Sequence, residues 1–230
     1  GVEGSFQWTV DACRYAAEAG LSLQINTSIS RHNLHQIPQM AALVESLGAV
    51  MWSVFFVVPT GRAQADQNLS PEEFETAFAQ IHAAAQKKVF DVKTTEAPHY
   101  RRYLLQHHAG PNAAAAGPLP RMHGGLGDGR GFVFVSHTGD VFPSGFLPLA
   151  GGNIREKPLA EIYRESPLFK AMRKPDEFKG KCGRCEFRQV CGGSRARAYA
   201  DSGDALGSDP ACVYQPGSKA QPVFAMGAPA

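Results

Sequence analysis

Four cysteines near the C-terminal end constrain this 230-residue chain more than any other feature. Cys182, Cys185, Cys191 and Cys212 follow the spacing Cys-x2-Cys-x5-Cys-x20-Cys, and the fifth cysteine, Cys13, lies far upstream. Four clustered thiolates are what one [4Fe–4S] cluster or one tetrahedral zinc ion requires. The C-terminal segment is therefore expected to fold around a metal or cluster site.

The spacing of these cysteines favours the cluster but leaves zinc open. Structural zinc usually takes two Cys-x2-Cys pairs, or one pair and two histidines. This segment has one such pair, and no histidine lies between residues 138 and 230. Gly192 and Gly193 follow Cys191 and would let the backbone approach a bulky cluster closely. In the zinc alternative, the chain would be a non-catalytic zinc-binding module.

The overall charge and hydropathy exclude two classes of partner. The chain has 23 basic and 21 acidic residues, which gives no electrostatic case for nucleic acid or for a membrane surface. No run of about 18 apolar residues is present that would span a bilayer. The chain shows no secretory signal and begins with glycine, so we expect part of a longer, cytoplasmic protein whose clustered cysteines bind metal rather than form disulfides.

The first 98 residues alternate helical and strand patterns. Apolar periodicity predicts helices over 8–20 and 37–49 and a third helix that begins after a capping box at Ser70. Strands are predicted over 21–29, 50–59 and 90–97. This alternation is typical of α/β units around a parallel sheet. Three such strands are too few to close an eight-stranded barrel alone.

The sequence changes in character after about residue 105. Residues 106–130 are rich in Gly, Ala and Pro and are predicted to be a linker that includes His107 and His108. A β-hairpin is expected over 131–147, turning at 137–140. One helix is expected over 158–173, with Leu159, Ile162, Tyr163 and Phe169 facing inward. The cysteine segment follows, and residues 217–230 are expected to be a tail.

Several segments resemble the radical S-adenosylmethionine (SAM) enzymes that carry an auxiliary-cluster extension of the SPASM or twitch type. The segment CGRCEFRQVCGGSRARAYADSGD and the upstream VSHTGDVFPSGFLPLAGGNIREKPLAEIY resemble that extension. The N-terminal GVEGSFQWTVDACRYAAEAGLSLQINTSISRHNL and FFVVPTGRA resemble the later part of the radical SAM barrel. The cysteine spacing is most similar to the tetrapyrrole-modifying branch, which acts in heme d1 and alternative heme biosynthesis.

This resemblance implies an α/β fold with two domains. A partial TIM-like barrel would occupy residues 1–105, and a small α+β iron–sulfur domain would occupy residues 131–216. Full SPASM domains hold two auxiliary clusters and carry cysteines where this chain has Ser144 and Ser194. The loss of both cysteines implies one auxiliary cluster, held by the four cysteines that remain.

The resemblance also implies a reaction for the intact enzyme. It would cleave SAM reductively to methionine and a 5′-deoxyadenosyl radical, which abstracts hydrogen from a tetrapyrrole side chain. The alternative substrate is a ribosomal peptide, and the electron donor would be a ferredoxin or flavodoxin. The catalytic [4Fe–4S] cluster of this family sits on a Cys-x3-Cys-x2-Cys motif that the chain lacks. We therefore expect this chain to be a C-terminal portion, inactive alone, with the second cluster bound by the missing N-terminal part.

Other candidate residues follow from the same resemblance. Asn26, Ser28 and Asn33 would make polar contacts to SAM, and Val57 and Pro59 would pack against its adenine. No catalytic residue is identified. The segment 93–102 (KTTEAPHYRR) would bind substrate carboxylates or pass a proton, unless its charged groups are simply solvated. Arg195 and Arg197 would neutralise the cluster or bind acidic groups of a tetrapyrrole, unless they are exposed helix arginines.

Overall fold

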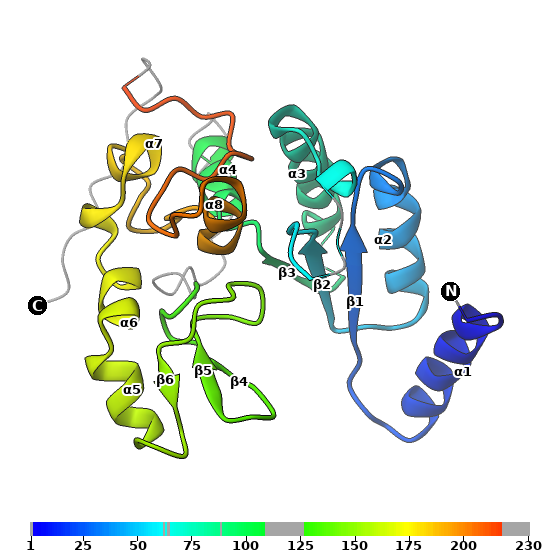
Figure 1. Cartoon of the computed structure of the whole chain (residues 1–230). Helices are drawn as coiled ribbons and strands as arrows, with labels where there is room; N and C mark the ends of the chain where they lie inside the picture. The colour runs from blue at the N-terminus through cyan, green and yellow to red at the C-terminus, as the bar shows by residue number, and fades with distance from the viewer. Residues whose placement is uncertain (1, 62, 64, 88, 109–126, 218–230) are drawn as a thin grey trace, which may run out of the picture. The chain divides into compact units, whose positions relative to one another are not determined.

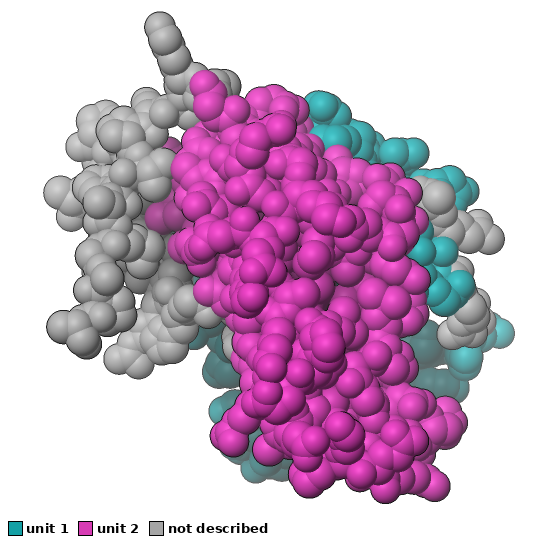
Figure 2. All heavy atoms as spheres, turned by 60° about the vertical axis from the view of Figure 1, so that its left-hand side comes forward, with its two compact units in different colours: residues 1–97 teal, residues 98–230 magenta. Residues whose placement is uncertain are grey.

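The computed structural model describes residues 2–61, 63, 65–87, 89–108 and 127–217. The chain divides into two compact units, Gly1–Ala97 and Pro98–Ala230 (Figure 2). Each unit has its own secondary structure, and each is described separately below. No helix in the described ranges is long and apolar enough to cross a membrane.

The first unit alternates helices and strands as the sequence predicts (Figure 1). Its elements in chain order are α1 (Ser5–Glu18), β1 (Gln24–Ile29), η1 (Leu34–Gln36), α2 (Ile37–Ser46), β2 (Met51–Phe56), η2 (Ala65–Gln67), α3 (Pro71–Ala85) and β3 (Asp91–Thr95). The predicted capping box is present, because the Ser70 hydroxyl accepts from the Glu73 amide and the Glu73 side chain accepts from the Ser70 amide. Cys13 of α1 is buried, as is typical of a residue on the apolar face of a helix.

Within the described residues, the strands of this unit form one parallel sheet in the order β1-β2-β3. Trp52, Val54 and Phe56 point from β2 to the same face and are buried. The Phe56 ring stacks on Phe74 of α3, with 4.9 Å between the ring centroids. This face of the sheet therefore packs against α3 to form the core of the first unit. The strands are too few to close a barrel, in agreement with the sequence.

The opposite face of this sheet is polar. Asn26 of β1, Ser53 of β2 and Lys93 of β3 are neighbours across the register and alternate with the core-facing residues. The side chains of Asn26, Ser28 and Lys93 are exposed. Met51 and Phe55 of β2 lie on the same face and are partly buried.

The second unit combines a small antiparallel sheet with short helices. Its elements are α4 (His99–His108), β4 (Phe134–Val135), β5 (Asp140–Phe142), β6 (Gly152–Asn153), α5 (Leu159–Glu165), α6 (Pro167–Met172), η3 (Pro175–Glu177), α7 (Gly180–Gly183) and α8 (Arg195–Ser202). The hairpin β4–β5 turns at the predicted residues, and β6 joins its other edge. Val141, Ile162 and Phe169 form the core beside this sheet.

Three expectations for the second unit are wrong. The predicted helix over 158–173 is two helices, because Ser166 is extended (φ −58°, ψ 131°) and Pro167 begins a new helix without an N–H. Leu159, expected inside, is 41% exposed. His107 and His108 end α4 instead of lying in a loop, and the His107 ring stacks on Tyr103.

The domain boundaries stay a prediction. The division after Ala97 assigns α4 to the second unit, whereas the resemblance places residues up to 105 in the barrel. Most of the predicted linker 106–130 and nearly all of the tail 217–230 lie outside the described residues.

Candidate iron–sulfur site

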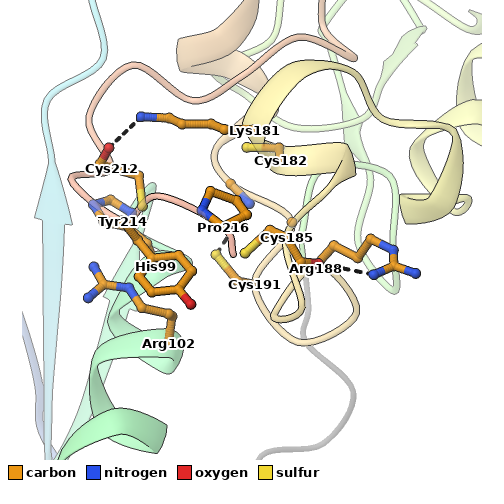
Figure 3. Close-up of a pocket in the computed structure, with 12 residues that line it drawn as sticks. His99, Arg102, Lys181, Cys182, Cys185, Arg188, Cys191, Cys212, Tyr214 and Pro216 are labelled. Carbon is orange, nitrogen blue, oxygen red and sulfur yellow. Dashed lines mark hydrogen bonds between the residues drawn. The ribbon is translucent and has the colours of Figure 1, made fainter. Parts of the chain in front are cut away.

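The four clustered cysteines of the second unit line one pocket (Figure 3). Cys182 lies in α7, Cys185 and Cys191 lie in the loops that follow, and Cys212 comes from the segment after α8. The pocket opens to solvent. The remaining lining residues include His99 and Arg102 of α4, together with Lys181, Arg188, Gly192, Gly193, Tyr214 and Pro216. The fold therefore gathers the thiols that the spacing singled out.

Hydrogen-bond donors are directed at the sulfurs of Cys191 and Cys182. The Gly193 amide donates to Cys191 Sγ at 3.4 Å, and the Asp209 amide donates to Cys182 Sγ at 3.3 Å. Arg195 Nη2 donates to the same Cys182 sulfur at 3.5 Å. Donors of this kind stabilise thiolate sulfur and adjust the potential of a bound cluster.

The loop after Cys191 can approach Cys182 and Asp209 this closely only because residue 193 is a glycine. Gly193 has a φ of +68°, and a Cβ there would lie 3.0 Å from Cys182 Sγ and 2.8 Å from Asp209 Cβ. Any side chain would push these groups apart as well as strain the backbone. The sequence expectation of close backbone approach at this turn therefore has a specific geometric basis.

Three of the thiols, those of Cys185, Cys191 and Cys212, have a raised pKa. Burial is the main cause in each case: it raises the pKa of Cys185 to about 11 and raises the pKa of Cys191 and of Cys212 above the ordinary thiol range. Thiolates would form here only if a bound metal displaced the protons.

The zinc and cluster alternatives require different distances between the four sulfurs. In the part of the chain that the structure describes, no three His, Cys, Asp or Glu side chains are grouped so as to hold one metal ion. Four zinc-bound sulfurs would lie about 3.8 Å apart, given a tetrahedral Zn–S bond of about 2.3 Å. A cluster holds its cysteines farther apart, since iron and sulfide lie between them.

Asp209 connects the parts of the site. Its carboxylate accepts from the Ser194 amide at 2.8 Å and the Ala211 amide at 3.0 Å, and it lies 3.3 Å from Arg197 Nη1. His99 Nδ1 is 3.9 Å from the same carboxylate. Burial opposes the charge, but Arg197, His99 and the amides outweigh it and lower the Asp209 pKa to about 2. Asp209 therefore ties the loop after Cys191 to the segment that carries Cys212.

Comparison with known proteins supports the assignment of this region. The SPASM family, described as an iron–sulfur cluster-binding domain, matches residues 128–186, which include Cys182 and Cys185. An "AdoMet-dependent heme synthase" of Methanosarcina barkeri is 41% identical over 223 residues, and one of Nitratidesulfovibrio vulgaris is 40% identical over 222 residues. The alignments cover 95% and 94% of this chain, and 64% and 60% of the relatives.

The fold is shared with a solved structure. Streptococcus suis SuiB, crystallised with S-adenosylmethionine, superposes with a TM-score of 0.60 over 90% of this chain and 48% of its own, at 16% identity. The chain is therefore similar to SPASM-type radical SAM enzymes in its matched domain, in its relatives and in its fold. It spans about 60% of the length of these heme synthase relatives.

Ser144 and Ser194, which the resemblance places where full SPASM domains carry cysteines, have structural roles here. The Ser194 hydroxyl caps α8 by accepting from the Arg197 amide at 3.0 Å, and the Ser144 hydroxyl accepts from the Phe146 amide at 3.3 Å. Ser194 is 2% exposed and Ser144 is 5% exposed. A hydroxyl that caps a buried helix start is well suited to a SPASM-type domain without a ligand at that position.

The structure buries charged residues that the sequence left open as solvated. Arg195 and Arg197 are 3% and 4% exposed, and Arg102 of α4 is 3% exposed. His99 is fully buried, and burial lowers its pKa to about 3. These side chains surround or support the cysteine pocket. Helical periodicity could not show this, because the covering groups come from distant segments.

The candidate SAM contacts all lie in the first unit. Asn26 and Ser28 are exposed on the polar face of β1, and Val57 and Pro59 follow β2. Asn33 is engaged locally, since it accepts from the Ser30 amide at 2.9 Å and donates to the Ser28 carbonyl at 2.9 Å. Both hydrogen bonds of the Asn33 side chain therefore hold the loop after β1. Asn26 likewise accepts from Gln24 at 2.7 Å.

Sequence reasoning missed Asp209 and Asp128. Asp128 Oδ2 accepts from the Arg195 and Ala196 amides at the start of α8, at 3.1 Å each. Asp209 stands three residues before Cys212, and this proximity to a ligand cysteine was an available signal. Asp128 stands in a Gly-rich segment remote from the cysteines, so nothing in its surroundings pointed to a helix start that lies 67 residues away.

Proposed function

We propose that this chain is the C-terminal portion of a radical SAM enzyme whose four clustered cysteines, Cys182, Cys185, Cys191 and Cys212, bind one auxiliary [4Fe–4S] cluster. The observation that carries the proposal is that all four line one pocket. The pocket supplies amide and guanidinium donors to the sulfurs and a glycine where a side chain would collide. The residues present therefore fit a thiolate-bound cluster.

We further propose that the whole protein modifies tetrapyrrole side chains. The support is the identity of about 40% to relatives named heme synthases, against 27% to a "PqqA peptide cyclase" of Granulibacter bethesdensis. In such enzymes SAM supplies a hydrogen-abstracting radical, and the auxiliary cluster exchanges an electron with substrate or contacts it. The basic groups Arg102 and Lys181 at the pocket would attract the carboxylates of a tetrapyrrole.

The first unit would contribute to the SAM pocket. Asn26 and Ser28 present polar side chains on the uncovered face of β1, and Val57 and Pro59 would pack against the adenine at the end of β2. Carboxyl ends of parallel strands carry ligand groups in α/β folds generally. Asn33 would act indirectly, by holding the loop after β1.

A second candidate is the maturation of a ribosomal peptide. It is supported by the peptide cyclase relative, which the chain matches over 94% of its length. In either case an acidic one-electron donor such as a ferredoxin or flavodoxin would supply electrons. The cytoplasm is the compartment we expect, because free thiols persist where disulfides are rare.

The test uses the full-length protein that contains this chain, purified and reconstituted without oxygen. It is incubated with SAM and dithionite, and with either a propionate-bearing tetrapyrrole or a candidate precursor peptide. We expect formation of 5′-deoxyadenosine and a changed tetrapyrrole mass. If the peptide changes mass and the tetrapyrrole does not, the tetrapyrrole proposal is wrong and peptide maturation is supported. If no 5′-deoxyadenosine forms with either substrate, the radical mechanism is rejected.

A further inference from the structure

Arg195 is buried against a candidate cluster ligand. It opens α8, and its side chain is held by carbonyl oxygens: Nη1 donates to Ala205 at 3.0 Å and to Gly207 at 2.7 Å, and Nε donates to Gly193 at 3.3 Å. The guanidinium also lies 4.5 Å from the centroid of the Phe178 ring. Nη2 is directed at Cys182 Sγ, 3.5 Å away. The packing fixes both the position and the direction of this charge.

The neighbouring Arg197 shows how this fold treats a buried cation. Arg197 is neutralised by the buried Asp209, at 3.3 Å. In the described ranges no carboxylate lies within ion-pair distance of the Arg195 guanidinium. The charge of Arg195 contributes to the lowered pKa of Asp204, but Asp204 forms its ion pair with Lys179 at the surface. A buried charge without a counter-charge is costly, so the site implies an anion beside Arg195.

We propose that Arg195 supplies the positive charge that compensates the Cys182 thiolate and thereby raises the reduction potential of the auxiliary cluster. This inference rests on the proposed cluster site. Four thiolates make the cluster unit negative, and one-electron reduction adds further negative charge. A fixed cation at a ligand sulfur stabilises the reduced state more than the oxidised state. Because Arg195 is buried, solvent screens this effect little.

The test compares three variants of the reconstituted full-length protein, or of this chain if it holds the cluster alone. Arg195→Gln removes the charge and keeps an amide donor, and Arg195→Lys keeps the charge on a side chain without the planar fork. Arg184→Gln is the matched control, since Arg184 is exposed beside Cys185 and loses the same charge. Iron and sulfide contents are measured first. The midpoint potential of the auxiliary cluster is then measured by redox titration followed by electron paramagnetic resonance.

We expect Arg195→Gln to retain the cluster and to lower its midpoint potential. At a fixed poise the ratio of reduced to oxidised cluster should fall about tenfold, which is about 59 mV for one electron. Arg195→Lys should shift the potential in the same direction by less, and Arg184→Gln should leave it unchanged.

Each other outcome decides between the proposals. If Arg195→Gln holds the cluster at the wild-type potential, the Arg195 inference is wrong and the cluster proposal stands. If Arg195→Gln loses the cluster, Arg195→Lys decides, and a potential at or above the wild-type value would overturn the inference. If the wild-type protein itself holds no cluster, both the proposed function and this inference are wrong.

Discussion

Asp209 is the residue on which most of the site's internal bonding converges. It lies fully buried and accepts from two backbone amides and from Arg197, while its own amide donates to Cys182. Its carboxylate organises two segments that each carry candidate ligands.

Replacement of Asp209 by alanine should destabilise the protein strongly. It would leave the Arg197 charge buried without its partner and two amides without acceptors, at a cost of about 3–5 kcal/mol. The free energy of unfolding is measured by chemical denaturation without oxygen. The control is Asp201→Ala on the exposed side of α8, which should change stability by no more than about 0.5 kcal/mol. Equal effects of the two variants would contradict the role of Asp209.

His99 should make the fold acid-sensitive. Burial, reinforced by Arg197, Arg102 and Lys181, lowers its pKa from 6.5 to about 3 despite the nearby Asp209. Below pH 6.5 the unfolded chain therefore binds a proton that the folded chain does not, so stability is lost as the pH falls from 6.5 toward 3. We expect a loss of about 2 kcal/mol between about pH 7.5 and about pH 5 that His99→Gln does not show. The same loss in both proteins would rule this out.

At the scale of elements, short sequence patterns predicted the helices and strands that form through interactions between residues near in sequence. The capping box at Ser70 predicted the start of α3. Alternating apolar residues predicted β1, and a continuous apolar run predicted β2. The break between α5 and α6 was also local, since Pro167 has no N–H, but the apolar spacing across it suggested one helix. The two-residue β6 has no pattern of its own, because pairing with β5 defines it.

The loop after Cys191 allows a matched glycine test. Gly193→Ala would strain the backbone and also place a Cβ against Cys182 and Asp209, whereas Gly203→Ala strains a similar backbone (φ +73°) with no atom within 4 Å. We expect Gly193→Ala to lose most of its bound iron and sulfide while Gly203→Ala retains wild-type content. Colorimetric iron and sulfide analysis of the two proteins decides, and equal retention would show that the close approach does not matter.

At the scale of the whole molecule, the sequence predicted the α/β fold and grouped the four cysteines. It did not predict that Arg195, Arg197 and His99 are buried. Their burial depends on contacts between segments far apart in the chain, such as Arg195 with Ala205 and Asp128 with the start of α8. The catalytic motif Cys-x3-Cys-x2-Cys is absent from this chain. In the proposed function, the four cysteines of this chain hold the auxiliary cluster and not the catalytic one.

Metal analysis of the anaerobically purified and reconstituted protein tests the central claim most directly. We predict about four iron and about four sulfide per chain for the auxiliary site. Serine replacement of Cys182, Cys185, Cys191 or Cys212 should lower both contents, and Cys13→Ser should leave them unchanged. About one zinc per chain, with no iron or sulfide, would contradict the account and support the zinc-binding alternative.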